Sequence, residues 1–303
     1  MEDYNVKKGI TSGVSAYLIW GFLPIYWKLL DHIHAGSVLA HRIIWSVIFM
    51  VVFLFITKRF NIFIQECKHI WHNKKIFLII ATAACIISVN WLIFIWAVHT
   101  ERVIQVSLGY YINPLMSVLL GVLFFKEKLS AAQTFSFILA GIGVTYLTFS
   151  YGIFPWVSLS LAITFAVYGL LKKLIHIQSI FSLTIETLLM MPIALIYLYA
   201  IFGNTIGFDN ESVGTIILLI ASGIATAVPL LLFGSAVQFI PLSMAGFLQY
   251  IAPTIMLVLG VFLYGEEFTT AHLITFTLIW ISLIVFMTSS INIRKKRQEQ
   301  EVL

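Results

Sequence analysis

The fold is decided by a stretch of sequence that occurs twice in the chain. Residues 89–127 read VNWLIFIWAVHTERVIQVSLGYYINPLMSVLLGVLFFKE, and residues 228–266 read VPLLLFGSAVQFIPLSMAGFLQYIAPTIMLVLGVFLYGE. Aligned at an offset of 139 without a gap, twelve of the 39 positions are identical. Matches between Val and Leu are common by chance in apolar sequence, but Tyr-Ile-x-Pro, Gly-Val and a terminal Glu also recur at fixed spacing. The repeat therefore indicates a chain built from two related halves.

The composition of the whole chain indicates an integral membrane protein. Its mean hydropathy is +1.00, and its residues are 60% hydrophobic and only 10% charged, which is far from the balance of a soluble domain. Cys67 falls in a basic loop and Cys85 inside an apolar run, so no disulfide framework is expected. The net charge of +5 is interpreted as loop residues that orient the protein in the lipid bilayer, and not as a sign of a nucleic-acid partner.

Apolar runs of about 20 residues are long enough to cross a membrane as helices. Ten such runs predict ten spans, at residues 10–30, 35–57, 76–98, 103–125, 130–149, 154–171, 179–201, 213–236, 243–264 and 271–291. Five of the seven prolines lie inside spans, which predicts bent helices around an interior, because the carbonyls that proline frees need partners that lipid cannot supply. These prolines are Pro24, Pro114, Pro192, Pro229 and Pro253.

The distribution of basic residues predicts the orientation of the spans. With the amino terminus inside, 15 of the 18 basic residues fall in cytoplasmic segments; Lys28 and Arg102 lie outside and Arg42 lies within a span. The positive-inside rule then places both termini in the cytoplasm of a multi-pass protein. An odd number of spans separates the two copies, so the copies must be inverted, with Glu127 inside and its counterpart Glu266 outside.

Five helices followed by five inverted helices is an architecture of secondary transporters, with the substrate site between the halves near the middle of the membrane. We therefore expect an all-α membrane protein of ten transmembrane helices. Its parts are a first five-helix repeat at residues 1–150, a second, inverted repeat at 151–291 and a basic cytoplasmic tail at 292–303. Alternating access uses such symmetry directly, which favours a transporter over an enzyme or a receptor.

Four motifs in order also resemble a known family over essentially the whole chain. They are His41-Arg42-Ile43-Ile44-Trp45-Ser46, Asn90-Trp91-Leu92-Ile93-Phe94-Ile95-Trp96-Ala97-Val98, Ser107-Leu108-Gly109-Tyr110-Tyr111-Ile112-Asn113-Pro114-Leu115 and Ile185-Glu186-Thr187. The chain resembles the bacterial RarD proteins, a branch of the EamA type within the drug/metabolite transporter superfamily. The resemblance implies a ten-helix inverted-repeat permease or exporter in the bacterial cytoplasmic membrane. It does not name a substrate, because the branch takes its name from a chloramphenicol-sensitivity phenotype.

Ionisable residues inside spans are expensive in lipid and are therefore candidates for function. Arg42 and Glu186 lie about seven residues into their spans, which is a depth of about 10 Å, from opposite sides of the membrane. We expect both to face a central cavity, where Arg42 holds an anionic substrate group or pairs with Glu186, and Glu186 is the candidate proton-coupling carboxylate. The alternative is a structural charge pair that fixes helix packing. His41 lies about 100° around the helix from Arg42 and is either a cavity residue or a packing residue.

Aromatic and amide side chains deep in the spans are candidate walls of the substrate site, suited to an amphipathic or aromatic small molecule. In the first half they are Trp20, Trp45, Asn90, Trp91, Tyr110, Tyr111 and Asn113, and in the second half Tyr168, Gln249 and Tyr250. Interhelical hydrogen bonding is the alternative role of the amides. Lys28, near the outer end of its span, is a candidate substrate or gate residue. Trp27 is interpreted as part of the aromatic belt at the membrane surface.

The sequence does not favour a catalytic or metal-dependent function. No His, Cys, Asp and Glu cluster has the spacing of metal ligands, and no phosphate-cradling Gly-x4-Gly-Lys-Ser/Thr loop exists for ATP. We therefore expect no metal, no cofactor and no enzymatic activity, and a secondary transporter of a small organic metabolite or drug. The rival interpretations are a passive channel and a non-transporting membrane sensor or assembly protein. A homodimer through glycine-lined helix faces is left open.

Overall fold

The computed structural model describes residues 2–99, 103–152, 155–175, 177–203, 207–208, 211–265 and 268–302. Arg102 and Glu266 thus lie outside the described residues. Over these ranges the chain is helical and contains no strand. The helices are α1 (Glu2–Lys28), α2 (Ala35–Ile56), α3 (Phe60–His72), α4 (Lys74–His99), α5 (Val103–Phe125), α6 (Ala131–Tyr151), α7 (Trp156–Leu174), α8 (Ser179–Phe202), α9 (Val213–Phe239), α10 (Leu242–Leu248), α11 (Ile251–Tyr264) and α12 (Thr270–Val302).

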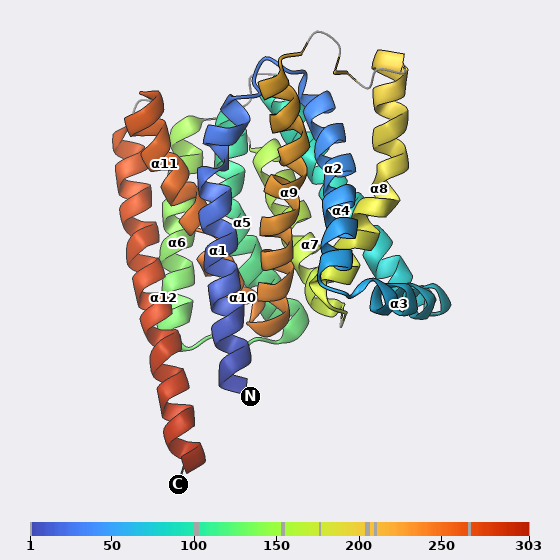
Figure 1. Ribbon diagram of the computed structural model, residues 1–303. Coiled ribbons are helices and arrows are strands. Elements are labelled where there is room, and N and C mark those ends of the chain that lie inside the picture. Colours follow the sequence, from blue (N-terminus) through green and yellow to red (C-terminus); the bar gives the residue numbers. More distant parts are fainter. Residues whose placement is uncertain are drawn as a thin grey trace.

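Most of these helices run alongside one another as a bundle (Figure 1). Within the described residues, nine helical segments are long and apolar enough to cross a membrane: α2, α4 to α9, the pair α10 and α11 together, and α12. The helix α1 runs along the same bundle between α9 and α12 (Figure 1). Each apolar run predicted from the sequence overlaps one of these helices, because a buried backbone in lipid has to satisfy its own hydrogen bonds.

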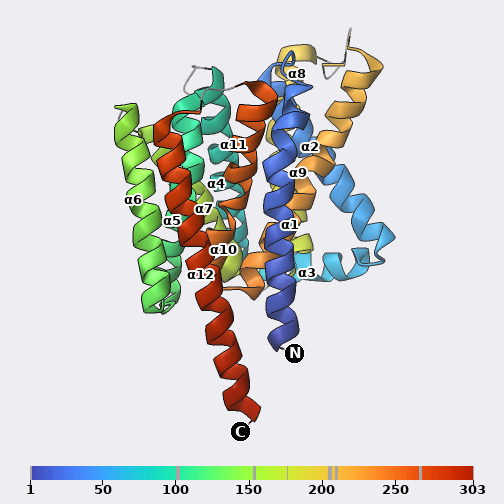
Figure 2. The same cartoon turned by 90° about the vertical axis from the view of Figure 1, so that its left-hand side faces the viewer.

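The short helix α3 corrects the sequence prediction of a plain loop between the second and third spans. It lies across one end of the bundle, roughly at right angles to the other helices (Figures 1 and 2). Phe63 and Ile70 face the core on one side of α3, whereas Trp71 is 73% exposed. Such an amphipathic helix suits the membrane surface, with its long axis in the plane of the interface.

The helices pack in a definite set of pairs. The helix α1 packs on α9 and α11, α2 on α8 and α9, α4 on α7 and α8, α5 on α7 and α10, and α6 on α12. Glycine permits the closest approaches: a Cβ atom at Gly223 of α9 would lie 2.3 Å from the carbonyl carbon of Trp45, and one at Gly246 of α10 would lie 2.8 Å from the carbonyl oxygen of Pro114. The backbones of α2 and α9, and of α5 and α10, are thus almost in contact.

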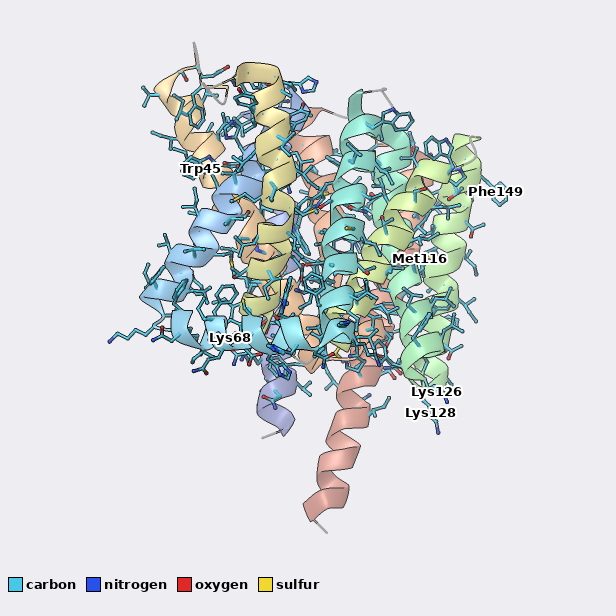
Figure 3. All side chains as sticks on the ribbon, turned by 90° about the vertical axis from the view of Figure 1, so that its right-hand side faces the viewer. Trp45, Lys68, Met116, Lys126, Lys128 and Phe149 are labelled. Atoms are coloured by element: carbon cyan, nitrogen blue, oxygen red, sulfur yellow. The ribbon has the colours of Figure 1, made fainter. Side chains whose placement is uncertain are left out.

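Both termini lie at the same end of the bundle (Figures 1 and 2). Figure 3 shows that the labelled lysines Lys68, Lys126 and Lys128 gather at this same end. We call it the terminal end, and the other the far end. Three of the basic residues that were assigned to one side of the membrane therefore lie at one end of the bundle.

The ninth predicted span is interrupted between α10 and α11. At Gln249 and Tyr250 the helix tightens, since the Tyr250 N–H donates to Phe247 O and the Ala252 N–H to Gln249 O, each three residues back. Pro253 follows and has no N–H to donate, which explains why the regular four-residue pattern fails at this point. The interruption lies about one third of the way along the span from its start, and Gln249 lines the interior cavity.

Candidate binding cavity

The bundle contains one large cavity among the described residues, with a volume of about 380 Å³. It is lined by α1, α2, α4 and α5 and by α7, α9, α11 and the residue Gln249 between α10 and α11. Its wall is formed by Tyr17, Trp20, Leu23, Pro24, Trp27, Arg42, Asn90, Trp91, Phe94, Val106, Gly109, Tyr110, Asn113, Leu161, Phe165, Thr226, Leu230, Gln249, Ala252, Pro253 and Met256. The size and the mainly apolar wall, about one third of whose residues are aromatic, with a few polar groups, are typical of a small-molecule site.

Arg42 is the single charged side chain in this wall, and aromatic rings hold it in place. Its guanidinium carbon lies 4.5 Å from the ring centroid of Trp27 and 5.1 Å from that of Trp91. Its Nε donates a hydrogen bond of 2.9 Å to Thr226 Oγ1. No carboxylate forms an ion pair with Arg42 within the described chain. Stacking on two indole faces and one hydrogen bond therefore position a cation that has no counter-charge.

The amide of Asn90 is fully engaged in holding two helices together. Its Nδ2 donates to Leu161 O at 2.9 Å and to Thr164 Oγ1 at 2.8 Å, both on α7. The interhelical hydrogen bond, which the sequence analysis gave as the alternative role of this residue, is therefore present. Asn90 also lines the cavity, so its position fixes the wall between α4 and α7.

Two other amides in the wall carry buried oxygens that accept no hydrogen bond from the described residues, namely Asn113 Oδ1 and Gln249 Oε1. The Gln249 Nε2 donates to Ser117 Oγ at 3.0 Å, and Ser117 lies one helical turn beyond Asn113 on α5. The hydroxyl group of Tyr17 lies beside the Gln249 side chain and is a third buried polar group of this part of the wall. Buried polar groups are rarely left without partners in folded proteins, so a bound ligand could pair with the open oxygens here.

Glu186 lies in a separate, buried charge cluster. Its carboxylate accepts from Lys172 Nζ at 2.7 Å and from the Tyr168 hydroxyl at 3.0 Å. Lys172 also donates to Ser182 Oγ at 2.6 Å, and the exposed fractions of Lys172 and Glu186 are 1% and 2%. The predicted alternative of an Arg42–Glu186 pair is therefore wrong for this structure, because the two residues have different partners.

The cluster borders a small second cavity of about 20 Å³. Tyr168 and Glu186 line it together with Trp91, which also lines the large cavity. Lys172 was assigned from the sequence to a cytoplasmic loop, but it lies inside α7 and is buried. The Lys172-Lys173 pair looks like a helix-ending basic turn, and the register that turns Lys172 inward could not be inferred from it.

Seven of the residues predicted from the sequence are in the wall of the large cavity: Trp20, Arg42, Asn90, Trp91, Tyr110, Asn113 and Gln249. Others lie elsewhere. His41 is buried with its ring stacked on Phe208, centroid to centroid 4.9 Å, and Lys28 is exposed at the end of α1. Neither residue lines the cavity, nor does Trp45.

Tyr111 and Tyr250 belong to an apolar cluster beside the cavity instead of to its wall. The Tyr111 ring packs edge-on against Phe276 with centroids 5.1 Å apart, and the Tyr250 hydroxyl donates to the Tyr111 carbonyl at 3.4 Å. These two positions are equivalent in the sequence repeat. They contact each other across the two halves, so their recurrence reflects packing between α5 and the α10–α11 segment.

Two residues of the Arg42 environment were missed or misassigned from the sequence. Trp27 was interpreted as belt because it lies near the end of a span, yet it covers the guanidinium of Arg42. Thr226 gave no signal, since one threonine in an apolar helix is common. The small residues Ser222, Gly223, Thr226 and Ala227, spaced three and four apart, could have indicated a face packed closely against another helix.

Glu127 follows α5 at the terminal end of the bundle and contacts the start of α10. Its two carboxylate oxygens accept from the backbone N–H groups of Leu242 at 2.6 Å and Ser243 at 2.9 Å, at the start of α10. Lys173 Nζ lies 3.9 Å from the same carboxylate and donates to the Ile240 carbonyl. A carboxylate at the N-terminus of a helix is favoured by the exposed N–H groups and the helix dipole. We call this set of contacts the Glu127 latch.

The cavity itself lies in the half of the bundle towards the far end. On α1 its wall runs from Tyr17 to Trp27, away from the N-terminus, and on α5 it runs from Val106 to Asn113, which is the half nearer the far end.

Metal binding has no support in the described residues, where no group of three His, Cys, Asp or Glu side chains comes together.

Comparisons with known proteins agree with this architecture. The EamA-like transporter family matches the chain twice, over residues 7–149 and 154–288. Uncharacterized transporter YojE of Bacillus subtilis (strain 168) is 44% identical over 291 residues, which cover 96% of this chain and 97% of that protein. Protein RarD of Escherichia coli (strain K12) is 38% identical over 297 residues, or 98% of this chain and 99% of that protein. A solved crystal structure with 14% identity superposes with a TM-score of 0.72, covering 92% of this chain and 96% of its own.

Proposed function

Because the chain belongs to the EamA-like transporter family, we propose that it is a secondary transporter that moves a small organic molecule across the membrane by alternating access. The observation that carries the proposal is the cavity of about 380 Å³ in the half of the bundle towards the far end. Helices from both halves of the chain supply its wall. A site shared by two related halves can be exposed to one side or the other when the halves move against each other.

We further propose that the fold comprises ten membrane-spanning helices in two inverted repeats, residues 1–150 and 151–291. The helix pairings support this. If α1, α2, α4, α5 and α6 correspond in order to α7, α8, α9, the α10–α11 segment and α12, each pairing between halves has a counterpart. The pair α1–α9 corresponds to α7–α4, α5–α7 to α11–α1, and α2–α9 to α8–α4. The pairs α2–α8, α5–α10 and α6–α12 correspond to themselves.

We assign the terminal end of the bundle to the cytoplasm and the protein to the bacterial cytoplasmic membrane. The lysines gathered at that end support this orientation (Figure 3), since basic residues are retained on the cytoplasmic side. The Glu127 latch then closes the cytoplasmic side while the cavity lies towards the outside. In the cycle we propose, this latch opens when the site turns inward.

Arg42 is the residue that we propose to bind the substrate, through an anionic group. A guanidinium held by Trp27 and Trp91 without a counter-charge in the wall supports this role, because its fork matches a carboxylate. Glu186 stays our candidate for proton coupling, with Lys172 as its counter-charge. On this proposal, flux through the Glu186→Gln variant loses the pH dependence of the wild type.

The test is flux in liposomes that contain the purified protein. Candidate substrates come first from a thermal-shift screen of amino acids, nucleotide precursors, organic anions and amphenicols. A carrier shows saturable uptake that is accelerated by substrate on the opposite side, whereas a channel shows neither. Absence of flux for each compound that binds would favour a sensor or assembly protein.

Two arginine variants then locate the site. We expect Arg42→Gln to lower flux at least tenfold at equal protein abundance, whereas Arg59→Gln is the matched control. Arg59 lies at the terminal end of the bundle, where it is exposed and bonds to Gln178. Equal flux in Arg42→Gln and wild type would remove Arg42 from the mechanism.

A further inference from the structure

The cavity has a positive pole whose hydrogen-bonding capacity is only partly used. The Arg42 Nε donates a hydrogen bond to Thr226, and no described residue accepts a hydrogen bond from either terminal guanidinium nitrogen. Those two nitrogens form the planar fork that binds a carboxylate through two parallel hydrogen bonds. Since Arg42 is the single charge in the wall, the pole balances one negative charge. A dianionic group such as a phosphate ester would stay half-compensated.

The cavity also has an acceptor pole, formed by Gln249 and Asn113. Both carry a buried side-chain oxygen without a partner among the described residues, and Gln249 is only 5% exposed. The bond from Gln249 to Ser117 Oγ brings the Gln249 amide to α5 within one turn of Asn113. Residues one turn apart share a helix face, so the two open oxygens belong to one patch of the wall.

The position of Gln249 supports a role in binding. It lies at the interruption between α10 and α11, where the backbone hydrogen bonds span three residues and not four. Pro253, shortly after it, also lines the cavity. Interrupted helices at mid-membrane are where transporters of inverted-repeat architecture build their substrate sites. A buried carbonyl-type oxygen with no donor costs stability that a bound N–H or O–H group restores.

Apart from these two groups the wall is mostly apolar, and about one third of its residues are aromatic. Trp20 and Phe165 are in edge-to-face contact, with ring centroids 5.7 Å apart, and Phe94 is 6.5 Å from Tyr110. Such walls favour a flat or branched apolar body over an extended polar one. The volume of about 380 Å³ is near the lower end for ligand sites, which favours a small molecule.

We infer that the ligand of this cavity is a small monocarboxylic acid that has an aromatic or apolar body and a second polar group able to donate a hydrogen bond. Its carboxylate binds the Arg42 fork, and its hydroxyl or amino group donates to Gln249 and Asn113. This inference rests on the proposed transport function, and it names the ligand class. A carrier of uncharged molecules would retain the proposed function and contradict this inference alone.

The experiment uses four related probes with the purified full-length protein. They are 3-phenyllactate and phenylalanine, which have both groups; 3-phenylpropionate, which lacks the donor; and phenylalaninamide, which lacks the carboxylate. Binding is followed by tryptophan fluorescence, since Trp20, Trp27 and Trp91 lie in the wall. We expect 3-phenyllactate or phenylalanine to bind at least tenfold tighter than 3-phenylpropionate, and phenylalaninamide to bind at least tenfold weaker than phenylalanine.

The variants assign each pole. We expect Arg42→Lys, which keeps the charge without the fork, to weaken all carboxylate probes. We expect Gln249→Leu to weaken only the donor-bearing probes, so that their advantage over 3-phenylpropionate disappears. Gln65→Leu, an exposed position on α3, is the matched control and keeps the full advantage. If Gln249→Leu does not fold, Asn113→Leu tests the same pole.

Three outcomes overturn the inference. The first is equal binding of 3-phenylpropionate and 3-phenyllactate by the wild type, if phenylalanine has no advantage either. The second is binding of phenylalaninamide as tight as that of phenylalanine. The third is the absence of binding for the whole series. If an uncharged compound from the liposome screen is transported in that case, the proposed carrier function stands and the inference about the ligand class alone is overturned.

Discussion

The ammonium of Lys172 lies 2.7 Å from the carboxylate of Glu186, and both side chains are almost completely buried. Tyr168 and Ser182 complete their hydrogen bonds from α7 and α8. The pair therefore joins two consecutive helices of the second half in an apolar setting. A charge left alone there has no water to compensate for its lost partner.

Removing one partner of this pair should destabilise the protein strongly. We expect Lys172→Met to lower the free energy of unfolding by about 3–5 kcal/mol, and Lys172→Met combined with Glu186→Met to recover most of the loss. Thermal unfolding in detergent measures both. A Lys172→Met single variant as stable as the wild type would mean that the pair carries no structural role.

Weakening the Glu127 latch should shift the protein towards an inward-open state. Glu127→Gln keeps the size of the side chain but removes the charge that faces the N-terminus of α10 and Lys173. We expect a cysteine introduced at Leu242 to react faster with a maleimide in the Glu127→Gln background. Glu66→Gln, on the surface helix α3, is the matched control. Unchanged reactivity would argue that the latch does not gate this side.

The contact between α2 and α9 should not tolerate a side chain at Gly223. A Cβ atom there would lie 2.3 Å from the Trp45 carbonyl carbon and 2.6 Å from the Ser46 nitrogen. We expect Gly223→Ala to cost about 1–3 kcal/mol by overpacking. At Gly141 of α6 an added Cβ would meet no atom within 4 Å.

Gly141→Ala is therefore the matched control. We expect it to be neutral or to stabilise by up to about 1 kcal/mol, because alanine favours a helix over glycine. Melting temperatures of the two variants in the same detergent decide the comparison. The expectation fails if Gly223→Ala is as stable as Gly141→Ala.

The thiol of Cys67 offers a test of orientation with a defined pH dependence. Partial burial, and secondly the nearby Glu66, raise the pKa of Cys67 above its ordinary value. Its reactive thiolate is therefore scarce at neutral pH and grows as the pH rises. In right-side-out vesicles we expect a membrane-impermeant maleimide to label Cys67 only after permeabilisation, and faster at pH 9 than at pH 7.

A Cys67→Ser, Lys68→Cys variant is the reference for this labelling. The neighbouring position 68 is exposed, so its thiol should react faster at pH 7 from the same side. Labelling of Cys67 in intact right-side-out vesicles would place α3 outside and reverse the proposed orientation.

The sequence was sufficient to locate the long helices, but it predicted less well which side of each helix faces the interior. Apolar length alone located the long helices, because a backbone in lipid has to form its hydrogen bonds within the helix. It missed α3, because this short segment lies between two clusters of basic residues and its polar residues make it look like a loop. Only Phe63 and Ile70 mark its buried side. It also missed the interruption at Gln249, since Pro253 suggested a bend without showing where the bonds tighten.

For the candidate site, the sequence predicted some of the residues that face the interior but not the pairs that they form. The interior position of Arg42 could be predicted, because a lone cation inside a span has few structural uses. The pairing of Glu186 with Lys172 was missed because helices that are apolar on nearly all sides leave no periodic pattern from which to infer which way Lys172 points. Trp27 was misassigned for a related reason, since nearness to a span end does not distinguish a belt residue from a cavity residue.

The lone charge of Arg42 has a consequence for how membrane voltage acts on the protein. In the alternating-access cycle that we propose, the empty site would carry an uncompensated positive charge when it switches sides. A charge that crosses the whole membrane field changes its energy by about 2.3 kcal/mol per 100 mV. A monoanion on Arg42 cancels that charge, so the loaded protein switches without electrical work. With a monoanionic ligand, an interior-negative potential would then change only the rate at which the empty site returns. A zwitterionic ligand brings no net charge, so the rates of both the loaded and the empty step would depend on voltage.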